Sequence, residues 1–273
     1  MTTVAVCQIA PVLGDKIATR GRIHGAVREA VAGGASIIVL PELIAPGYMF
    51  RDRDELMAAA EPSDGPTAHD WCRLATEHQV MIIGGMAERA GDVVYNSALM
   101  VDEAGVRAVY RKAHLWNHEK TVGFHAGSEQ PPVIDTPFGR IGMMICYDLE
   151  FPEWVRLVAL DGADLLCAPA NWPQYPRPDG ERPGEVVRVQ ADAAVNRMFV
   201  AVADRTGLER GQDWVGGSVI VDPDGYPVTR LALGGPAVLT ADLDLSKARN
   251  KSISEENDVL ADRRPTLYSR IAQ

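Results

Sequence analysis

Several short, uninterrupted apolar runs in the chain are typical of strands buried on both faces. The clearest cover residues 36–40, 80–84 and 163–169, and each is bounded by turn formers or charged residues. Apolar residues at helical spacing lie between these runs, at about residues 17–32, 52–60, 67–78, 151–160 and 184–196. Residues 102–105 and 222–225 have the composition of tight turns. Because helices alternate with strands and also with hairpins, we predict mixed β-sheets covered by helices, not a purely parallel Rossmann or barrel fold.

Three of the predicted strands end in a residue that can take part in catalysis. Glu42 follows one apolar run, Lys112 follows the strand predicted at 106–111, and Cys146 closes the run that begins at Ile141. Strand ends are where α/β proteins usually place their sites. At the start of a following helix, backbone N–H groups would lower the pKa of the Cys146 thiol and hold a developing oxyanion. Any one of these residues alone could be a packing or surface residue, but their shared position favours a single site with Cys146 as nucleophile.

Length and composition limit the other possibilities. The 273 residues contain no fixed-period repeat and no long linker, so we expect one domain over residues 1–273. A net charge of −10 without a basic block gives no reason to bind nucleic acid or acidic lipid. With no apolar run of about 18 residues and no N-terminal signal pattern, we expect no membrane association and a cytoplasmic location. Four scattered cysteines without a CxxC pair indicate reduced thiols.

Five segments resemble the nitrilase, or carbon–nitrogen hydrolase, superfamily, whose signature is a Glu–Lys–Cys triad. They contain Leu-Pro-Glu-Leu at 40–43 with Gly-Tyr at 47–48, and Tyr-Arg-Lys-Ala-His-Leu-Trp at 110–116. The other three are Ile-Cys-Tyr-Asp-Leu-Glu-Phe-Pro-Glu at 145–153, Asn-Trp at 171–172, and Asp-Arg-Arg-Pro-Thr-Leu-Tyr at 262–268. The resemblance covers essentially the whole chain. It implies a four-layer αββα sandwich, usually dimerised through helices, and a homodimer or higher homo-oligomer. The polar tail, about residues 246–273, is expected to pack on a partner subunit.

The same resemblance implies roles for individual residues. Glu42 would be the general base, Cys146 the nucleophile, and Lys112 with the N–H of Tyr147 the oxyanion hole. Glu119 matches a second glutamate that orients the substrate amide and supports Lys112. Four further positions are expected to line the substrate pocket: Tyr48, Trp116, Asn171 and Trp172.

We therefore expect a cofactor-free amidase that converts a small carboxamide to its acid and ammonia through a Cys146 thioester. The Cys-Tyr-Asp sequence at 146–148 resembles amidase branches more than nitrilases, and residues 146–153 look most like those of aliphatic amidases. An N-carbamoyl amidohydrolase is the main alternative, because its triad would be identical. Nitrile hydrolysis and a non-catalytic binding role rank lower.

Other kinds of site have weaker support. His114, His118 and His125 lie close in sequence, but no HExxH pattern accompanies them, so we expect no metal. The glycines of a hydrolase nucleophile elbow are absent around Cys146, and the glycine pairs match neither GxGxxG nor a P-loop. Nucleotide binding is unsupported.

Overall fold

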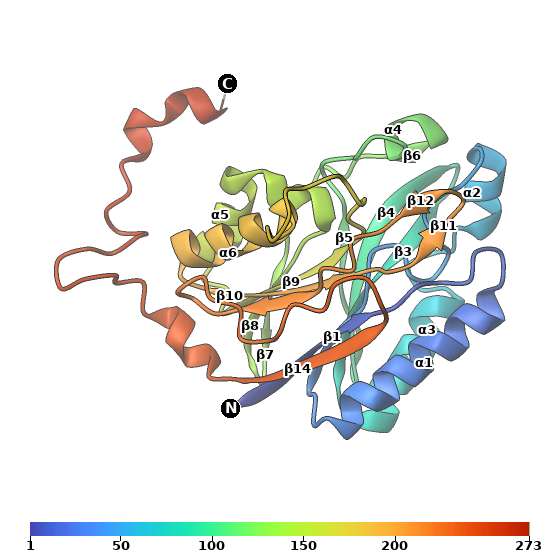
Figure 1. The fold of residues 1–273 in the computed structure, drawn as a ribbon, viewed down its shortest axis with the longest axis horizontal. Helices are drawn as coiled ribbons and strands as arrows, with labels where there is room; N and C mark the ends of the chain where they lie inside the picture. Colours follow the sequence, from blue (N-terminus) through green and yellow to red (C-terminus); the bar gives the residue numbers. More distant parts are fainter. Residues whose placement is uncertain (273) are drawn as a thin grey trace.

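The computed structural model describes residues 1–272 and contains two β-sheets packed face to face (Figure 1). Across these residues the first sheet has seven strands, in the order β14-β1-β2-β3-β4-β5 with β6 beside β4. The second sheet has five strands, in the order β13-β10-β9-β8-β7, and β11 pairs with β12 in a separate ribbon. The strands of the first sheet are β1 (Thr2–Gln8), β2 (Ile37–Val39), β3 (Met81–Ala90), β4 (Val93–Asp102), β5 (Gly105–Arg111), β6 (Phe124–His125) and β14 (Ala237–Leu243). Those of the second sheet and the ribbon are β7 (Val133–Thr136), β8 (Gly139–Met143), β9 (Leu165–Ala170), β10 (Phe199–Asp204), β13 (Val219–Val221), β11 (Leu208–Glu209) and β12 (Gln212–Asp213).

Helices cover the outer face of each sheet, which gives the expected four-layer αββα order. Figure 1 shows α1 (Lys16–Ala32) and α3 (Pro66–His78) on the first sheet, and α5 (Pro152–Leu160) and α6 (Gly184–Asn196) on the second. The remaining helical segments are α2 (Arg53–Ala59), α4 (Glu119–Val122) and the 3₁₀ turns η1 (Cys146–Glu150), η2 (Leu245–Arg249), η3 (Pro265–Leu267) and η4 (Ser269–Ala272). The prediction of mixed sheets covered by helices is confirmed.

The apolar strands are explained by this layering, because each has a buried neighbour on both faces. In β1, Val4 and Val6 belong to the core that includes both sheets, whereas Ala5 and Cys7 pack with the residues of α1 and α3. Successive side chains of a strand point to opposite faces, so a strand between two buried layers is apolar at every position. The inner core joins the two sheets and thereby fixes their relative position.

Some boundaries differ from the sequence prediction. β2 is only three residues long, so Glu42 lies in the loop after it, and Cys146 lies three residues beyond the end of β8. Strand β7, which pairs antiparallel with β8, was not predicted. Its residues Val133–Thr136 are only half buried or exposed, so they lack the continuous apolar run by which the other strands were recognised.

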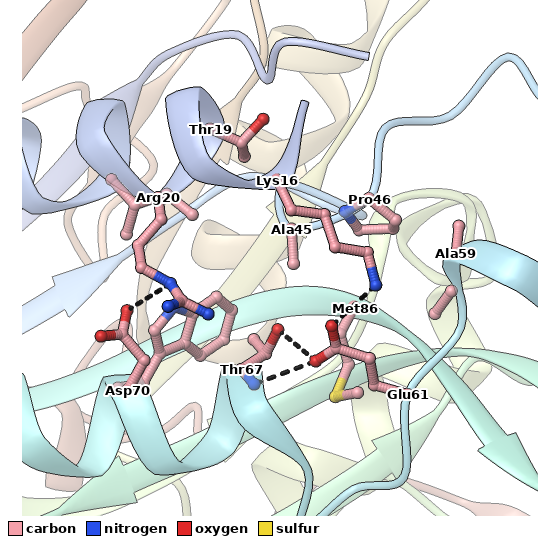
Figure 2. Close-up of a pocket in the computed structure, with 13 residues that line it drawn as sticks. Lys16, Thr19, Arg20, Ala45, Pro46, Ala59, Glu61, Thr67, Asp70 and Met86 are labelled. Atoms are coloured by element: carbon pink, nitrogen blue, oxygen red, sulfur yellow. Dashed lines mark hydrogen bonds and ion pairs between the residues drawn. The ribbon is translucent and has the colours of Figure 1, made fainter. Parts of the chain in front are cut away.

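A small hollow between α1, α3 and the loop after β2 is shown in Figure 2. Lys16 Nζ donates to Glu61 Oε1 at 2.8 Å, and the Thr67 hydroxyl donates to Glu61 Oε2 at 2.7 Å. Arg20 lies 3.6 Å from Asp70. The volume of about 30 Å³ is room for a single water, and the charges around it are already paired. The ion pairs around the hollow therefore connect α1 to α3 and to Glu61 before it. The hollow itself has no space for a larger ligand.

Gly85 in β3 generates a testable prediction, because the loop that carries Glu42 crosses directly over it. A Cβ at this position would lie 2.2 Å from the backbone nitrogen of Leu43 and 2.6 Å from Cα of Glu42. Gly85→Ala should therefore lower the free energy of unfolding by about 1–3 kcal/mol, as overpacking does. Urea unfolding of the purified protein measures this.

The matched control is Gly21→Ala on the exposed face of α1, where an added Cβ meets nothing within 4 Å. Alanine has the higher helix propensity, so this variant should be more stable than the parent by up to about 1 kcal/mol. Equal stabilities of the two variants would contradict the close contact between β3 and the loop.

Candidate active site

Glu42, Lys112 and Glu119 meet at one end of the first sheet. Lys112 Nζ donates to Glu42 Oε1 and to Glu119 Oε1, each at 2.7 Å. All three residues are at most 1% exposed. Lys112 directly follows β5, Glu42 lies in the loop after β2, and Glu119 begins α4. The loop that carries Glu42 thus meets a segment distant in sequence, residues 112–119, in one buried ionic cluster.

Burial and charge set the protonation of this cluster. Burial raises the pKa of Glu42 to about 7, with Lys112 opposing this rise and Glu119 adding to it. Although burial alone would lower the pKa of Lys112, Glu119 and Glu42 raise it well above its usual range. The ammonium therefore stays charged, while Glu42 can gain or lose a proton near neutral pH.

Asn96 in β4 belongs to the same cluster and was not predicted as a site residue. Its side-chain nitrogen donates to Glu42 Oε1 at 2.6 Å and to Glu119 Oε1 at 3.2 Å, while its backbone oxygen accepts from Lys112 N–H at 2.8 Å. The position of this polar amide inside residues 93–101, a run typical of a buried strand, is the sequence signal that could have identified it. Asn96 fixes both carboxylates in position.

Tyr48 lies beside Glu119, where its hydroxyl donates to Glu119 Oε1 at 2.8 Å. The backbone N–H groups of Tyr48 and Met49 donate to Glu209 Oε1 at 2.8 and 2.6 Å, and Arg205 Nη2 lies 2.6 Å from Glu209 Oε2. Burial raises the pKa of the Tyr48 hydroxyl well above its usual range, so the phenol stays a donor. The buried Arg205–Glu209 pair therefore fixes the loop that supplies this bond.

Cys146 comes from the second sheet, at the start of η1. Its φ of 45° is in the left-handed region, where residues other than glycine are uncommon, so the turn holds the thiol in a strained conformation. Sγ lies 3.8 Å from the backbone oxygen of Asn171, to which the thiol donates. A sharp turn thus presents the cysteine without the flanking glycines of a hydrolase nucleophile elbow.

The expected lowering of the Cys146 pKa is wrong. Burial raises this pKa well above the usual range and Glu42 raises it further, while Lys112 and the bond to Asn171 only partly oppose them. Proximity to a short helical turn does not offset the loss of water around a side chain only 7% exposed. The resting group is a thiol, so it needs a base to become a nucleophile.

Asp148 connects the cysteine turn to the lysine segment. Its Oδ2 accepts from the Tyr110 hydroxyl at 2.8 Å and from Ile145 N–H at 3.2 Å, and its Oδ1 accepts from His114 N–H at 3.0 Å. The His114 ring also lies 2.7 Å from Oδ1 and stacks on Phe151. One buried carboxylate thereby fixes the turn of Cys146 relative to the segment that follows Lys112.

A cavity of about 250 Å³ opens beside the thiol. Of the predicted pocket residues, Trp116, Tyr147, Asn171 and Trp172 line it, whereas Tyr48 does not. Trp172 N–H donates to Asp204 Oδ1 at 2.8 Å, which fixes the loop after β9. As the second residue of η1, Tyr147 has a backbone N–H without a partner inside the turn. The other lining residues are Glu150, Pro173, Tyr175, Glu185 and Arg188, of which Glu150, Glu185 and Arg188 were not predicted.

The histidines considered as metal ligands have other partners. The His118 ring lies 2.7 Å from the backbone oxygen of Phe50, and His125 packs edge-on against Tyr95. Within residues 1–272, no group of three or more His, Cys, Asp or Glu side chains is arranged to hold a metal ion. Over the same residues, no helix has the length and apolarity needed to span a membrane.

Residues 3–251 match the family described as Carbon-nitrogen hydrolase. The chain belongs to the nitrilase, or carbon–nitrogen hydrolase, superfamily. It is 36% identical over 273 residues to a nitrilase of Pyrococcus abyssi, covering 99% of this chain and 100% of that one. It is 33% identical over 259 residues to N-carbamoylputrescine amidase of Arabidopsis thaliana, covering 89% of this chain and 86% of that one.

Solved structures agree with this assignment. An amidase from Nesterenkonia sp. AN1 superposes with a TM-score of 0.81 at 26% identity, covering 99% of this chain and all of the other. A variant of that amidase carries acrylamide added to its active-site cysteine. The protein studied here is an amidase-like hydrolase that acts on carbon–nitrogen bonds.

Asn96 provides a prediction about the electrostatics of the hydrolase. Asn96→Asp would place a third carboxylate next to Glu42, and a nearby like charge raises the pKa of a carboxyl group. If Glu42 must be ionised to accept the thiol proton, alkylation of Cys146 by iodoacetamide will need a pH about one unit or more higher than in the parent. Peptide mass spectrometry of Cys146 across a pH series measures the rate.

Asn250→Asp makes the same chemical change at an exposed position away from the cluster. It should leave the pH dependence of Cys146 alkylation unchanged. Coincident profiles for Asn96→Asp and the parent protein would disprove the coupling between Asn96 and Glu42.

Proposed function

We propose that this hydrolase is an amidase that converts a small carboxamide to its carboxylic acid and ammonia through a thioester on Cys146. The observation that carries the proposal is the buried Lys112 ammonium between Glu42 and Glu119, beside a cavity lined by the Cys146 thiol. The charges of Glu42 and Lys112 both act on that thiol. A base, a cation and a nucleophile are the groups that amide hydrolysis requires.

In the first half-reaction, Glu42 accepts the Cys146 proton as sulfur attacks the amide carbon. The C–S bond forms and the carbonyl electrons move to oxygen, giving a tetrahedral oxyanion. Protonated Glu42 then gives its proton to the amide nitrogen, the C–N bond breaks, and ammonia leaves. Because the pKa of Glu42 is raised to about 7, the carboxyl group is suited to both transfers near neutral pH.

In the second half-reaction, water replaces ammonia. Glu42 removes a proton from the water as its oxygen attacks the thioester, and collapse of the second tetrahedral intermediate breaks the C–S bond. The departing sulfur takes the proton back from Glu42, so the acid is released and the enzyme returns to its starting state. One carboxylate serves both steps.

Lys112 and the backbone N–H of Tyr147 stabilise the oxyanion in both steps. Lys112 is fully buried, and a fixed positive charge is worth far more in such a site than in water. Glu119 shares the lysine ammonium with Glu42 and is itself held by Tyr48 and by the N–H of Trp116 at 3.0 Å. We assign Glu119 the role of supporting Lys112 and orienting the substrate amide.

The mechanism predicts the behaviour of two variants. Cys146→Ala should reduce ammonia release from a panel of short amides by at least about 1,000-fold, because no thioester can form. Glu42→Gln should reduce it by about 100-fold or more and remove the loss of kcat/KM that the parent shows below pH 7. In the parent, kcat/KM falls below pH 7 because Glu42 is then protonated and cannot accept the thiol proton.

Cys72→Ser is the matched control, since Cys72 is a partly exposed thiol on α3 away from the cavity. It should retain parental turnover. Ammonia release that persists in Cys146→Ala would refute the thioester. Alkylation of Cys146 without turnover of any amide, carbamoyl compound or nitrile would favour a binding module instead.

An N-carbamoyl amidohydrolase is the second candidate, because relatives at 32–33% identity carry the name N-carbamoylputrescine amidase. The same site residues would act on a ureido carbon. That reaction releases carbon dioxide together with ammonia, whereas amide hydrolysis releases ammonia alone. Measuring both gases from matched amide, carbamoyl and nitrile substrates separates the three activities.

We also propose a single hydrolase domain that forms a homodimer, with its C-terminal tail packed on the partner. Beyond η2, Figure 1 shows the chain leaving the body of the molecule in an arc. A cavity of about 890 Å³ lies between α5, α6 and this segment, and both Leu160 and Val195 beside it are more than 40% exposed. An apolar surface of this kind favours burial by a second copy.

Because the nucleophile must remain a thiol, we propose a cytoplasmic location.

Sedimentation analysis tests the dimer. Leu160→Asp should shift the protein towards the monomer, since it introduces an uncompensated charge into the proposed interface. Ile17→Asp on α1 is the control, because Ile17 is also an exposed apolar residue but lies on the opposite outer layer. The same mass for all three proteins would exclude this interface.

A further inference from the structure

The cavity beside Cys146 has a charged part that the proposed reaction does not use. Glu150, Glu185 and Arg188 line it, Glu150 from η1 and the other two from α6. Arg188 Nη2 lies 2.6 Å from Glu150 Oε1 and 3.5 Å from Glu185 Oε1. A single guanidinium therefore faces two carboxylates, which leaves a net charge of about −1 on the lining side chains at neutral pH.

A buried acidic side chain, Asp192, lies behind this group. Asp192 follows Arg188 by one turn of α6, is 5% exposed, and has an Oδ2 without a hydrogen-bond partner among the described residues. Burial raises the pKa of Asp192 to about 7, Glu150 raises it further, and Arg188 opposes the rise. Burial, together with Glu185, likewise raises the pKa of Glu150 despite the ion pair with Arg188. Burial is the main cause of both rises in pKa, and a cation bound in the cavity would oppose them by favouring the ionised carboxylates.

A second feature of the cavity also points to a ligand. Asn171 lines it, is 1% exposed, and has neither side-chain nitrogen nor side-chain oxygen hydrogen-bonded within residues 1–272. A buried amide with both ends unpaired is costly unless another molecule supplies the partners. Most of the remaining wall is aromatic and consists of Trp116, Tyr147, Trp172 and Tyr175, with Pro173 beside them. Aromatic faces attract cations and offer nothing comparable to an anion.

We infer that the preferred substrate carries a positively charged ammonium group at the end opposite the scissile C–N bond, with Glu185 and Glu150 facing that group. This inference rests on the proposed hydrolysis at Cys146. The cavity of about 250 Å³ limits the substrate to a short chain. Arg188 is not a free anchor for a substrate carboxylate, because the carboxylates of Glu150 and Glu185 already occupy it.

Three amides of matched length test the inference: 4-aminobutanamide, its neutral isostere pentanamide, and the anionic glutaramate. The parent enzyme should give kcat/KM values in the order cation, neutral, anion, with at least about a tenfold step from the first to the second. N-carbamoyl-1,3-diaminopropane and N-carbamoylbutylamine repeat the cation-to-neutral comparison for carbamoyl substrates. A parent enzyme that prefers glutaramate, or that does not discriminate, overturns the inference.

Substitutions of opposite charge sharpen the test. Glu185→Gln should reduce the ratio of kcat/KM for 4-aminobutanamide to that for pentanamide by about tenfold, mainly through KM. Arg188→Gln should increase the same ratio, because it removes the only positive side chain among the described residues that line the cavity. Glu181→Gln changes an exposed carboxylate in the loop before α6, outside the lining, and should leave the ratio as it is. A fall in the ratio in Arg188→Gln would contradict the inference.

A binding measurement distinguishes failure of this inference from failure of the proposed function. Calorimetric titration of Cys146→Ala with the three amides reads charge preference without turnover. Turnover of pentanamide with no charge preference would sink the inference and leave the amidase intact. Tighter binding of 4-aminobutanamide without hydrolysis of any compound would support the charge preference and disprove the amidase.

Discussion

The site depends on the cost of placing charge in a dry interior. Glu42, Lys112 and Glu119 are buried together, and none of them would stay ionised there alone. The lysine ammonium keeps at least one carboxylate charged, and the two carboxylates keep the lysine protonated. Removing Lys112 would leave two buried carboxylates without a counter-ion, so this cluster also contributes to the stability of the fold. The surrounding donors, Asn96 and Tyr48, supply the hydrogen bonds that such a cluster needs to exist without water.

The same burial explains how the thiol is controlled. A nucleophile that rested as a thiolate would react with many electrophiles, whereas burial keeps Cys146 protonated. In the proposed mechanism its reactivity then depends on Glu42, which receives the proton only as the bond to substrate forms. The strained backbone at Cys146 and the Asp148 hydrogen bonds hold the sulfur ready for that transfer. Control of the thiol therefore resides in the carboxylate and not in the sulfur alone.

The sequence predicted the fold and the meeting of Glu42 with Lys112 because both depend on strong local patterns. Continuous apolar runs identified the doubly covered strands, and α6 begins and ends where helical spacing predicts, at Gly184 and Asn196. The joint position of Glu42 and Lys112 followed from their places at strand ends. Asn96 and the charged group around Arg188 were missed, because burial and pairing depend on segments distant in sequence. The pKa of Cys146 was predicted with the wrong sign for the same reason: helix position is visible in the sequence, but loss of solvent is not.

The two sheets contribute different groups to the site, and a backbone hydrogen bond joins them there. Glu42 N–H donates to the backbone oxygen of Ala170 at 3.4 Å, so the loop of the first sheet leans on the last residue of β9 in the second. Glu42, the proposed proton acceptor, and the sulfur of Cys146 thus belong to separate sheets, whose spacing is maintained by the apolar core between them. A substitution that changes side-chain volume deep in this core would change the distance between Glu42 and the sulfur of Cys146, which the proposed proton transfer must cover. Distant interior residues can therefore tune turnover without touching any reacting group.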